Sequence, residues 1–157
     1  MHDIYLGLGS NIGRRRNNLK KALTWLVKSN FQIIQVSGII ETKPYGPVKQ
    51  GLFLNMAVYG KTTFSPFDFL EKIHWIEEKM GRKKTARWGP RNIDIDILFF
   101  DNVVLSAPDL TIPHPDIECR DFVLRPLLEI NPNLIHPVLN KTIQTLWEDY
   151  LKNECES

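Results

Sequence analysis

Two carboxylates, Asp94 and Asp96, stand two positions apart in the otherwise apolar segment 93–100. In a β-strand both would point the same way, with Cα atoms about 7 Å apart and the alternating isoleucines packed on the other face. The pair requires a cation or a basic partner, because like charges repel and Asp is depleted in strands. Mg²⁺ fits, because it takes one or two carboxylates and completes its octahedron with waters and substrate phosphates. A strand with a solvated face is the alternative that this segment alone leaves open.

A basic segment precedes the two carboxylates. Residues 79–93 contain no Asp or Glu, and their cations are Lys79, Arg82, Lys83, Lys84, Arg87 and Arg91. Residues 82–92 show no apolar periodicity, so we expect a loop. Polyphosphate chemistry uses both signs of charge, because metal ions held by carboxylates neutralise one side of the phosphate chain and arginines bind the rest. The arrangement indicates a polyphosphate site, and an ordinary basic surface loop is the alternative.

Familiar phosphate-binding and nucleophile motifs are missing. There is no GxxxxGK[ST] string, and residues 7–13 fail GxGxxG because the third glycine comes one residue late. His114 lies between two prolines and is followed by Arg120, which makes it a candidate phosphate donor, although a loop histidine is usually just exposed. Neither cysteine has a neighbouring histidine and no GxSxG elbow occurs. Direct transfer between bound substrates is therefore favoured over a covalent enzyme intermediate.

The segment 87–98, RWGPRNIDIDIL, resembles the signature of the 6-hydroxymethyl-7,8-dihydropterin pyrophosphokinase family of the folate pathway. The resemblance extends over most of the chain, through Gly9-Ser10-Asn11, Thr42 to Gly46, Leu54-Asn55, Glu77, Gly81-Arg82, Pro113-His114, Arg120 and Phe122. It implies transfer of a pyrophosphoryl group from the co-substrate ATP to the pterin hydroxymethyl oxygen, giving AMP and the pterin diphosphate. It also implies two Mg²⁺ ions.

The resemblance assigns roles to individual residues. Asp94 and Asp96 would hold the two Mg²⁺ ions, and Arg82 and Arg91 would act with them in catalysis. The implied ATP contacts are Leu70, Arg82, Lys84, Trp88, Arg91, Ile97, Thr111, His114 and Arg120. The implied pterin contacts are Thr42, Pro44, Tyr45, Phe53, Asn55, Trp88 and Phe122.

Within the implied pterin site, Phe53 and Phe122 match an aromatic sandwich, which suits a flat heterocycle. Asn55 and Thr42 match the polar groups that read the edge of the ring. Without the resemblance, both phenylalanines would be interpreted as core aromatics. The chain differs from the family pattern at four positions implied to lie near ATP, namely His74, Lys84, Asp109 and Pro115, and its loop after Lys84 is one residue shorter.

The pattern of apolar residues predicts the elements that must position these groups. Strands are expected over residues 3–8, 31–42, 52–62 and 93–100, with helices around 19–27 and 65–80 and weaker helices over 122–129 and 142–152. Ser65, Pro66 and Asp68 form the clearest helix start, with an N-cap serine and a proline at the first helical position. The order predicts an α+β fold: a ferredoxin-like βαββαβ core with a C-terminal helical extension, its helices packed on a mostly antiparallel sheet.

Composition sets the class of protein. The chain has 157 residues, 43% of them hydrophobic and 24% charged, which predicts one domain over residues 1–157. An acid, Asp3, stands where a signal peptide would be basic, no apolar stretch approaches 18 residues, and the two cysteines lack CxxC spacing. We therefore expect a cytoplasmic protein without a membrane span. The absence of heptads argues against a coiled-coil dimer, and we expect a monomer.

The distribution of charge sharpens the choice of ligand. The net charge is only +2, but residues 1–93 carry 16 Lys and Arg against 6 Asp and Glu, and residues 94–157 carry 4 against 12. The boundary lies between the basic loop and Asp94, which favours one small, magnesium-bound polyanion. A ferredoxin-like nucleic-acid-binding module would show an RNP1-like string, and none occurs, so we expect no nucleic acid. Another two-metal nucleotide or polyphosphate transferase remains an alternative.

Overall fold

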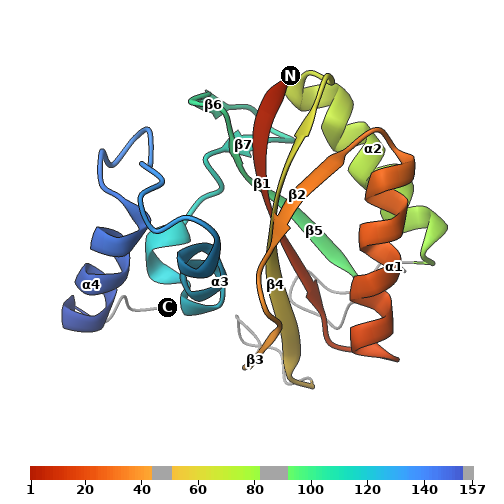
Figure 1. Ribbon diagram of the computed structural model, residues 1–157, viewed down its shortest axis with the longest axis horizontal. Coiled ribbons are helices and arrows are strands. Elements are labelled where there is room, and N and C mark those ends of the chain that lie inside the picture. The colour runs from red at the N-terminus through yellow and green to blue at the C-terminus, as the bar shows by residue number, and fades with distance from the viewer. Residues whose placement is uncertain (44–50, 82–91, 154–157) are drawn as a thin grey trace.

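The structure is a computed structural model that describes residues 1–43, 51–81 and 92–153. The core elements are β1 (His2–Ser10), α1 (Arg15–Lys28), β2 (Gln32–Val36), β3 (Ile40–Thr42), β4 (Phe53–Thr62), α2 (Pro66–Lys79) and β5 (Asp94–Phe100). They are followed by β6 (Leu105–Ser106), β7 (Thr111–Ile112), a 3₁₀ turn (Ile117–Cys119), α3 (Asp121–Ile130) and α4 (Ile143–Asn153). Helices α1 and α2 cover one face of the sheet, and α3 and α4 lie on the other (Figure 1).

The sheet has the predicted ferredoxin-like arrangement. Its strands run in the order β2-β4-β1-β5, every pair is antiparallel, and β3 extends the sheet beside β4. The strand expected over residues 31–42 is interrupted at residues 37–39 and forms β2 and β3. The Ser37 hydroxyl donates to the Gly38 carbonyl oxygen at 2.8 Å and accepts from the Ala57 amide at 2.8 Å. These bonds hold the bend against β4, so both pieces pair with the same long strand.

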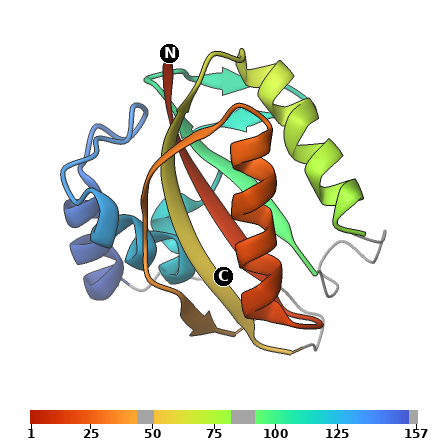
Figure 2. The same ribbon diagram turned by 45° about the vertical axis from the view of Figure 1, so that its right-hand side comes forward.

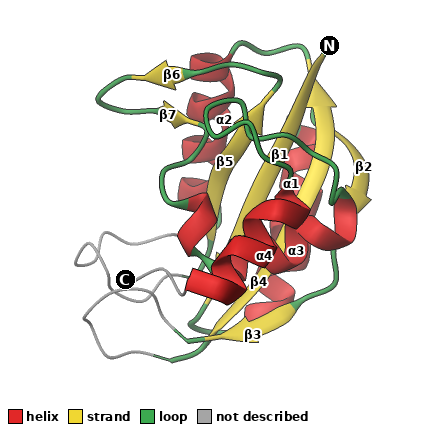
Figure 3. Cartoon of the chain, turned by 90° about the vertical axis from the view of Figure 1, so that its left-hand side faces the viewer, coloured by secondary structure: helices red, strands yellow, loops and turns green. Residues whose placement is uncertain are grey.

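Two hydrophobic clusters lie between the sheet and its helices, one on each face. Figure 2 shows the helices on the two sides of the sheet. The first lies under α1 and α2 and includes Ile93, Ile95 and Ile97, the isoleucines that alternate with the two carboxylates. The second lies under α3 and α4 and includes Leu98 and Phe99 from the far end of β5. Of the β5 residues, only ones beyond Asp96 belong to the cluster under α3 and α4. Figure 3 shows these two helices in front of the sheet.

A β-bulge explains how β5 contributes side chains to both hydrophobic clusters. The pairing of β1 with β5 shifts between Tyr5 and Leu6, so Leu98 has no partner of its own on β1. The consecutive residues Leu98 and Phe99 both belong to the second cluster, and Phe100 belongs to the first. The extra residue changes which face the strand buries, as bulges do. The carboxylate end of β5 thus stays outside the α3–α4 core.

Helix α2 begins with the N-cap serine that the sequence predicts, whereas α1 begins without a side-chain cap. Ser65 caps α2, accepting from the Asp68 amide at 3.3 Å, with Pro66 at the first helical position. Helix α1 begins after Arg14, whose side chain makes no capping bond. The weaker helices predicted near the C-terminus are present as α3 and α4, whereas the short strand β7 was not predicted. Within the described residues, no helix is long and apolar enough to cross a membrane.

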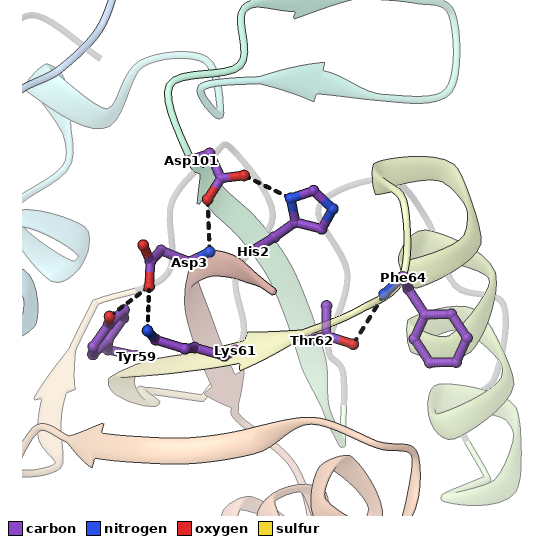
Figure 4. A network of polar contacts seen from close by, with 7 residues as sticks. All are labelled: His2, Asp3, Tyr59, Lys61, Thr62, Phe64 and Asp101. Atoms are coloured by element: carbon purple, nitrogen blue, oxygen red, sulfur yellow. Dashed lines mark hydrogen bonds and ion pairs between the residues drawn. The ribbon is translucent and has the colours of Figure 1, made fainter.

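A polar network ties together the end of the sheet that lies away from the two carboxylates (Figure 4). Asp101 accepts from the Asp3 amide at 2.7 Å, and its other oxygen lies 2.7 Å from His2 Nδ1. Asp3 accepts from the Tyr59 hydroxyl at 2.6 Å and lies 3.6 Å from Lys61 Nζ. The hydrogen bond to Asp3 raises the pKa of Tyr59 to about 12. These contacts fix the ends of β1, β4 and β5 against one another.

Candidate active site

The two carboxylates lie on one face of the sheet, at the start of β5. Asp94 and Asp96 are half-buried residues of β5, and the alternating Ile93, Ile95 and Ile97 are buried on the other face, as predicted. The Asp96 side chain is 41% exposed, which leaves its oxygens accessible to a ligand. The described residues contain no group of three His, Cys, Asp or Glu side chains that could hold a metal ion. Two carboxylates still fit Mg²⁺, whose remaining ligands come from water and phosphate.

His114 lies beside this pair, although it is eighteen positions from Asp96 in the sequence. Its Nε2 is 3.8 Å from Asp96 Oδ1. The backbone amide of His114 donates to the Leu98 carbonyl oxygen at 3.0 Å, and its Nδ1 lies 3.0 Å from the Pro115 carbonyl oxygen. Burial lowers the pKa of His114 below its ordinary value, although the bond to the Pro115 carbonyl opposes this. The site therefore favours a neutral imidazole at neutral pH.

An open cavity of about 330 Å³ adjoins the carboxylates on the α2 side. Helix α2 and strand β5 form two of its walls, and residues 108–115 form the third. Leu70, Ile97, Thr111 and His114, all implied ATP contacts, line it together with Asp94 and Asp96. His74, Asp109 and Pro115, where the chain departs from the family pattern, line the same cavity. The tertiary structure thus places these segments around one space.

A second group of predicted residues lies across β1 from the carboxylates. Gly9 pairs with Asn55 on one side and with Asp94 on the other. Neighbouring strands are about 4.8 Å apart, so about 10 Å separates the Asn55 and Asp94 backbones. Asn55 Nδ2 donates to Thr42 Oγ1 at 2.6 Å, and both residues are buried. An added Cβ at Gly9 would lie 3.1 Å from Asn55 Oδ1 and 3.4 Å from Phe53 Cδ1. Gly9 therefore leaves the space that the Asn55 and Phe53 side chains occupy.

Arg120 and Phe122 mark the start of α3. Arg120 precedes the helix, and its Cζ lies 5.9 Å from the centre of the Phe122 ring. Phe122 is half-buried and packs against the cluster under α3 and α4. Arg120 also lowers the pKa of His114, a smaller effect than burial. Arg120 therefore acts electrostatically on the histidine next to the carboxylates.

Comparison with known proteins decides the family. The family model of 7,8-dihydro-6-hydroxymethylpterin-pyrophosphokinase (HPPK) matches residues 5–132. The chain belongs to this family. An HPPK of Aquifex aeolicus is 43% identical over 156 residues, covering 99% of this chain and 97% of the relative. An HPPK of Bacillus subtilis is 45% identical over 127 residues, covering 80% and 76% of the two chains.

A solved structure supports the fold. The Plasmodium falciparum HPPK-DHPS crystal structure with pteroate superposes with a TM-score of 0.78 at 22% identity. The match covers 96% of this chain and 42% of that chain, so the chain spans less than half of that protein. HPPK enzymes are diphosphokinases of folate biosynthesis that use ATP as co-substrate. The chain is therefore an ATP-dependent diphosphokinase.

Several residues expected in the HPPK site fall outside the described ranges. These are Pro44, Tyr45, Arg82, Lys84, Trp88 and Arg91. The structure does describe the residues on either side of 82–91. Asn92 Nδ2 donates to the Met80 carbonyl oxygen at 2.7 Å, and Asn92 Oδ1 accepts from the Ile93 amide at 3.0 Å. Asn92 thus joins the end of α2 to the start of β5, a role that sequence reasoning did not find.

A second residue that sequence reasoning left without a role is Glu77. It is only 5% exposed, and its Oε2 accepts from the Ile95 amide at 3.1 Å. Ile73 and Ile76 on the same helix are buried, so Glu77 is a carboxylate within an apolar stripe. A charged residue at a core-facing position is itself a signal, because burying one is costly unless it is hydrogen-bonded. The sequence could have revealed it, because Glu77 stands on the apolar side of the helix predicted over residues 65–80.

Proposed function

We propose that the chain transfers the pyrophosphoryl group of ATP directly to the hydroxymethyl oxygen of 6-hydroxymethyl-7,8-dihydropterin. One observation carries the proposal: Asp94 and Asp96 lie between a cavity beside α2 on one side and the Asn55–Thr42 pair on the other. Two different substrates can therefore approach the same carboxylates. In-line displacement requires this arrangement of donor and acceptor.

ATP is assigned to the cavity beside α2. Leu70, Ile97 and Thr111 would contact the nucleoside, since they line the cavity. His114 and Arg120 would contact the phosphate chain, because His114 Nε2 reaches to 3.8 Å from Asp96 and Arg120 acts electrostatically on His114. Arg82, Lys84, Trp88 and Arg91 complete the assignment on sequence grounds, with the arginines opposing the negative charge of the moving group.

The pterin is assigned to the space over Gly9. Asn55 carries both a donor and an acceptor, and its bond to Thr42 Oγ1 holds the amide in one orientation. Phe53 and Phe122 would stack on the two faces of the ring. Pro44, Tyr45 and Trp88 are assigned as further pterin contacts on sequence grounds. The separation of about 10 Å between the Asn55 and Asp94 backbones suits a two-ring heterocycle whose hydroxymethyl group must reach the carboxylates.

Asp94 and Asp96 would hold two Mg²⁺ ions. The fit rests on two half-buried carboxylates on one strand face, both of which line the cavity of about 330 Å³ assigned to ATP. Bound there, the ions would neutralise phosphate oxygens and the charge that develops during transfer. The protein's own part is to orient the carboxylates, exclude water and align the two substrates.

The reaction balances without an enzyme-bound intermediate. The hydroxymethyl oxygen forms a bond to the β-phosphorus of ATP, and the bond from that phosphorus to the α,β-bridging oxygen breaks. AMP leaves with this oxygen, and the hydroxyl proton is released. His114 is favoured as the neutral imidazole, and it lies beside Asp96 on the phosphate side of the site. We therefore assign phosphate binding to His114.

The decisive measurement is the nucleotide product. The chain is incubated with ATP, Mg²⁺ and the pterin, and AMP and ADP are quantified by chromatography, with a reaction lacking the pterin as control. Pterin-dependent AMP in equal amount to pterin diphosphate supports the proposal. Pterin-dependent ADP would show transfer of a single phosphoryl group. Absence of pterin-dependent AMP would overturn the proposal.

Three further expectations from the sequence accompany this proposal. We propose that residues 1–157 act as a single domain, that the protein is monomeric, and that it works in the cytoplasm. Light scattering on the full chain tests the oligomeric state: a mass near 18.2 kDa supports the monomer, and a multiple of it contradicts it.

A further inference from the structure

Strand β5, which carries both carboxylates, lies at the edge of the sheet. Within the described residues it pairs with β1, while the strand order leaves its outer edge without a neighbouring strand. Edge strands expose backbone groups that other parts of a protein must satisfy or protect. Two contacts serve the outer edge here: Glu77 accepts from the Ile95 amide at 3.1 Å, and the His114 amide donates to the Leu98 carbonyl oxygen at 3.0 Å.

The amide that donates to Glu77 belongs to Ile95, the residue between Asp94 and Asp96. The Ile95 amide belongs to the peptide unit that joins Asp94 to Ile95, and Asp96 is the next residue. Rotation of that peptide unit would turn the Asp94 and Asp96 side chains relative to each other. On the inner edge, Gly9 and Gly7 pair opposite Asp94 and Asp96. The outer edge needs an equivalent restraint, and Glu77 supplies it.

Glu77 itself is buried between α2 and the sheet. It is 5% exposed and lies in the last turn of α2, a helix whose Phe69, Ile73 and Ile76 are buried against the sheet. A buried carboxylate costs several kcal/mol unless hydrogen bonds compensate, so an apolar residue would be the simpler choice for packing alone. Its place in the cavity wall beside Asp94 and Asp96 suggests a role in the site.

We propose that Glu77 is a positioning residue, which fixes the spacing of Asp94 and Asp96 for metal-bound ATP by holding the Ile95 amide. The inference rests on the proposed function, because it requires those carboxylates to be the metal ligands. Groups that orient metal ligands from behind typically change metal affinity or activity by about 10- to 100-fold when they are removed. In this role Glu77 acts through the strand, by way of the Ile95 amide.

The test separates the hydrogen bond from simple packing. Glu77→Met has similar volume and no acceptor for the Ile95 amide, whereas Glu77→Gln keeps an acceptor oxygen. Glu78→Ala is the matched control, because Glu78 is the neighbouring carboxylate on α2 and is exposed. Thermal unfolding of each variant establishes that it is folded. Two quantities are then measured: amide hydrogen exchange of Ile95 by NMR, and binding of Mn²⁺ by EPR with a non-hydrolysable ATP analogue present.

We expect faster Ile95 exchange and about 10- to 100-fold weaker Mn²⁺ binding in Glu77→Met, and values within about threefold of wild type in Glu78→Ala. Glu77→Gln should keep both the protected amide and Mn²⁺ binding within about threefold. Faster Ile95 exchange without weaker Mn²⁺ binding would overturn the inference. So would weak Mn²⁺ binding in Glu77→Gln with its Ile95 amide still protected, because charge would then be responsible.

Asp96→Ala distinguishes failure of this inference from failure of the proposed function. If Asp96→Ala loses Mn²⁺ binding and Glu77→Met does not, only the role of Glu77 is wrong. If Asp96→Ala keeps wild-type Mn²⁺ binding, the assignment of the metal ligands is wrong, and the inference fails with it.

Discussion

Asn55 and Asp94 lie opposite the same residue, Gly9, from the two strands that flank β1. One belongs to the proposed pterin site and the other to the proposed metal site, so a single backbone position separates the two substrates. The absence of a side chain at Gly9 matters for this reason. An added methyl group would meet Asn55 Oδ1 at 3.1 Å and the Phe53 ring at 3.4 Å.

We therefore predict that Gly9→Ala weakens use of the pterin. Displacement of the Asn55 amide and the Phe53 ring should raise the pterin KM by about 10-fold, with a smaller change in the ATP KM. Gly7→Ala is the matched control, because a Cβ at Gly7 would meet the Leu98 side chain at 3.5 Å, an ordinary contact. Steady-state kinetics with each substrate varied in turn checks both variants. Equal effects at the two glycines would contradict the assignment of the pterin to Gly9.

Removal of a proposed metal ligand should affect turnover more than folding. Asp96 is 41% exposed, so Asp96→Ala should leave the thermal unfolding midpoint nearly unchanged. We expect kcat to fall by about 100-fold or more at saturating Mg²⁺, because charge stabilisation during transfer is lost. Asp68→Asn, at an exposed carboxylate on α2, should keep wild-type turnover. Near-normal rates in Asp96→Ala would show that the metal is held elsewhere.

His136 should make stability depend on pH. It is 5% exposed, and its Nδ1 accepts from the amides of Val138 and Leu139 at 3.2 and 3.1 Å, which requires that nitrogen to be unprotonated. Burial lowers the pKa of His136 in the folded protein, and nearby Glu118 opposes this only partly. The unfolded chain therefore binds the proton first, at a pKa of about 6.5. The stabilising contribution is present above that pH and is lost as the pH falls through the lowered folded value.

Denaturant unfolding at pH 7.5, 6.5 and 5.5 measures this dependence. In His136→Asn the amide oxygen can replace Nδ1 as acceptor without titrating, so the free energy of unfolding should fall less between pH 7.5 and 5.5 than in wild type. His74→Asn, at an exposed histidine, should keep the wild-type slope. If the free energy of unfolding of His136→Asn falls with pH as much as that of wild type, His136 does not cause the pH dependence.

Helix α1 offers a stabilising change. Arg14 is at the N-cap and makes no side-chain capping bond, and the first turn of the helix contains no acid. Arg14→Asp adds an acceptor for the free amides and a negative charge near the positive end of the helix. We expect a gain of about 1 kcal/mol in the free energy of unfolding and a rise in Tm of about 2–4 °C. Arg14→Ala, which adds no acceptor, should give little gain, and calorimetry compares the two.

The sequence determined the parts of this protein that depend on local pattern. The two-residue alternation at 93–97 identified the strand and the shared face of Asp94 and Asp96, and the Ser65–Pro66 start identified α2. The motif at 87–98 identified the family, because its residues are consecutive in the chain. Periodicity and capping involve neighbours within a few residues, so no long-range contact is needed to recognise them.

The tertiary structure decided everything that depends on register and on contacts between distant segments. Gly9 between Asn55 and Asp94, Glu77 on the Ile95 amide, and His114 beside Asp96 join residues 18 to 85 positions apart. The interruption at Ser37 and the bulge at Leu98 likewise depend on the partner strands β4 and β1. Pairing register is set by the packing of both strands at once, because a shift of one residue would exchange the faces of the sheet. No short segment of the sequence specifies the register, because the register depends on the packing of strands that are distant in the chain.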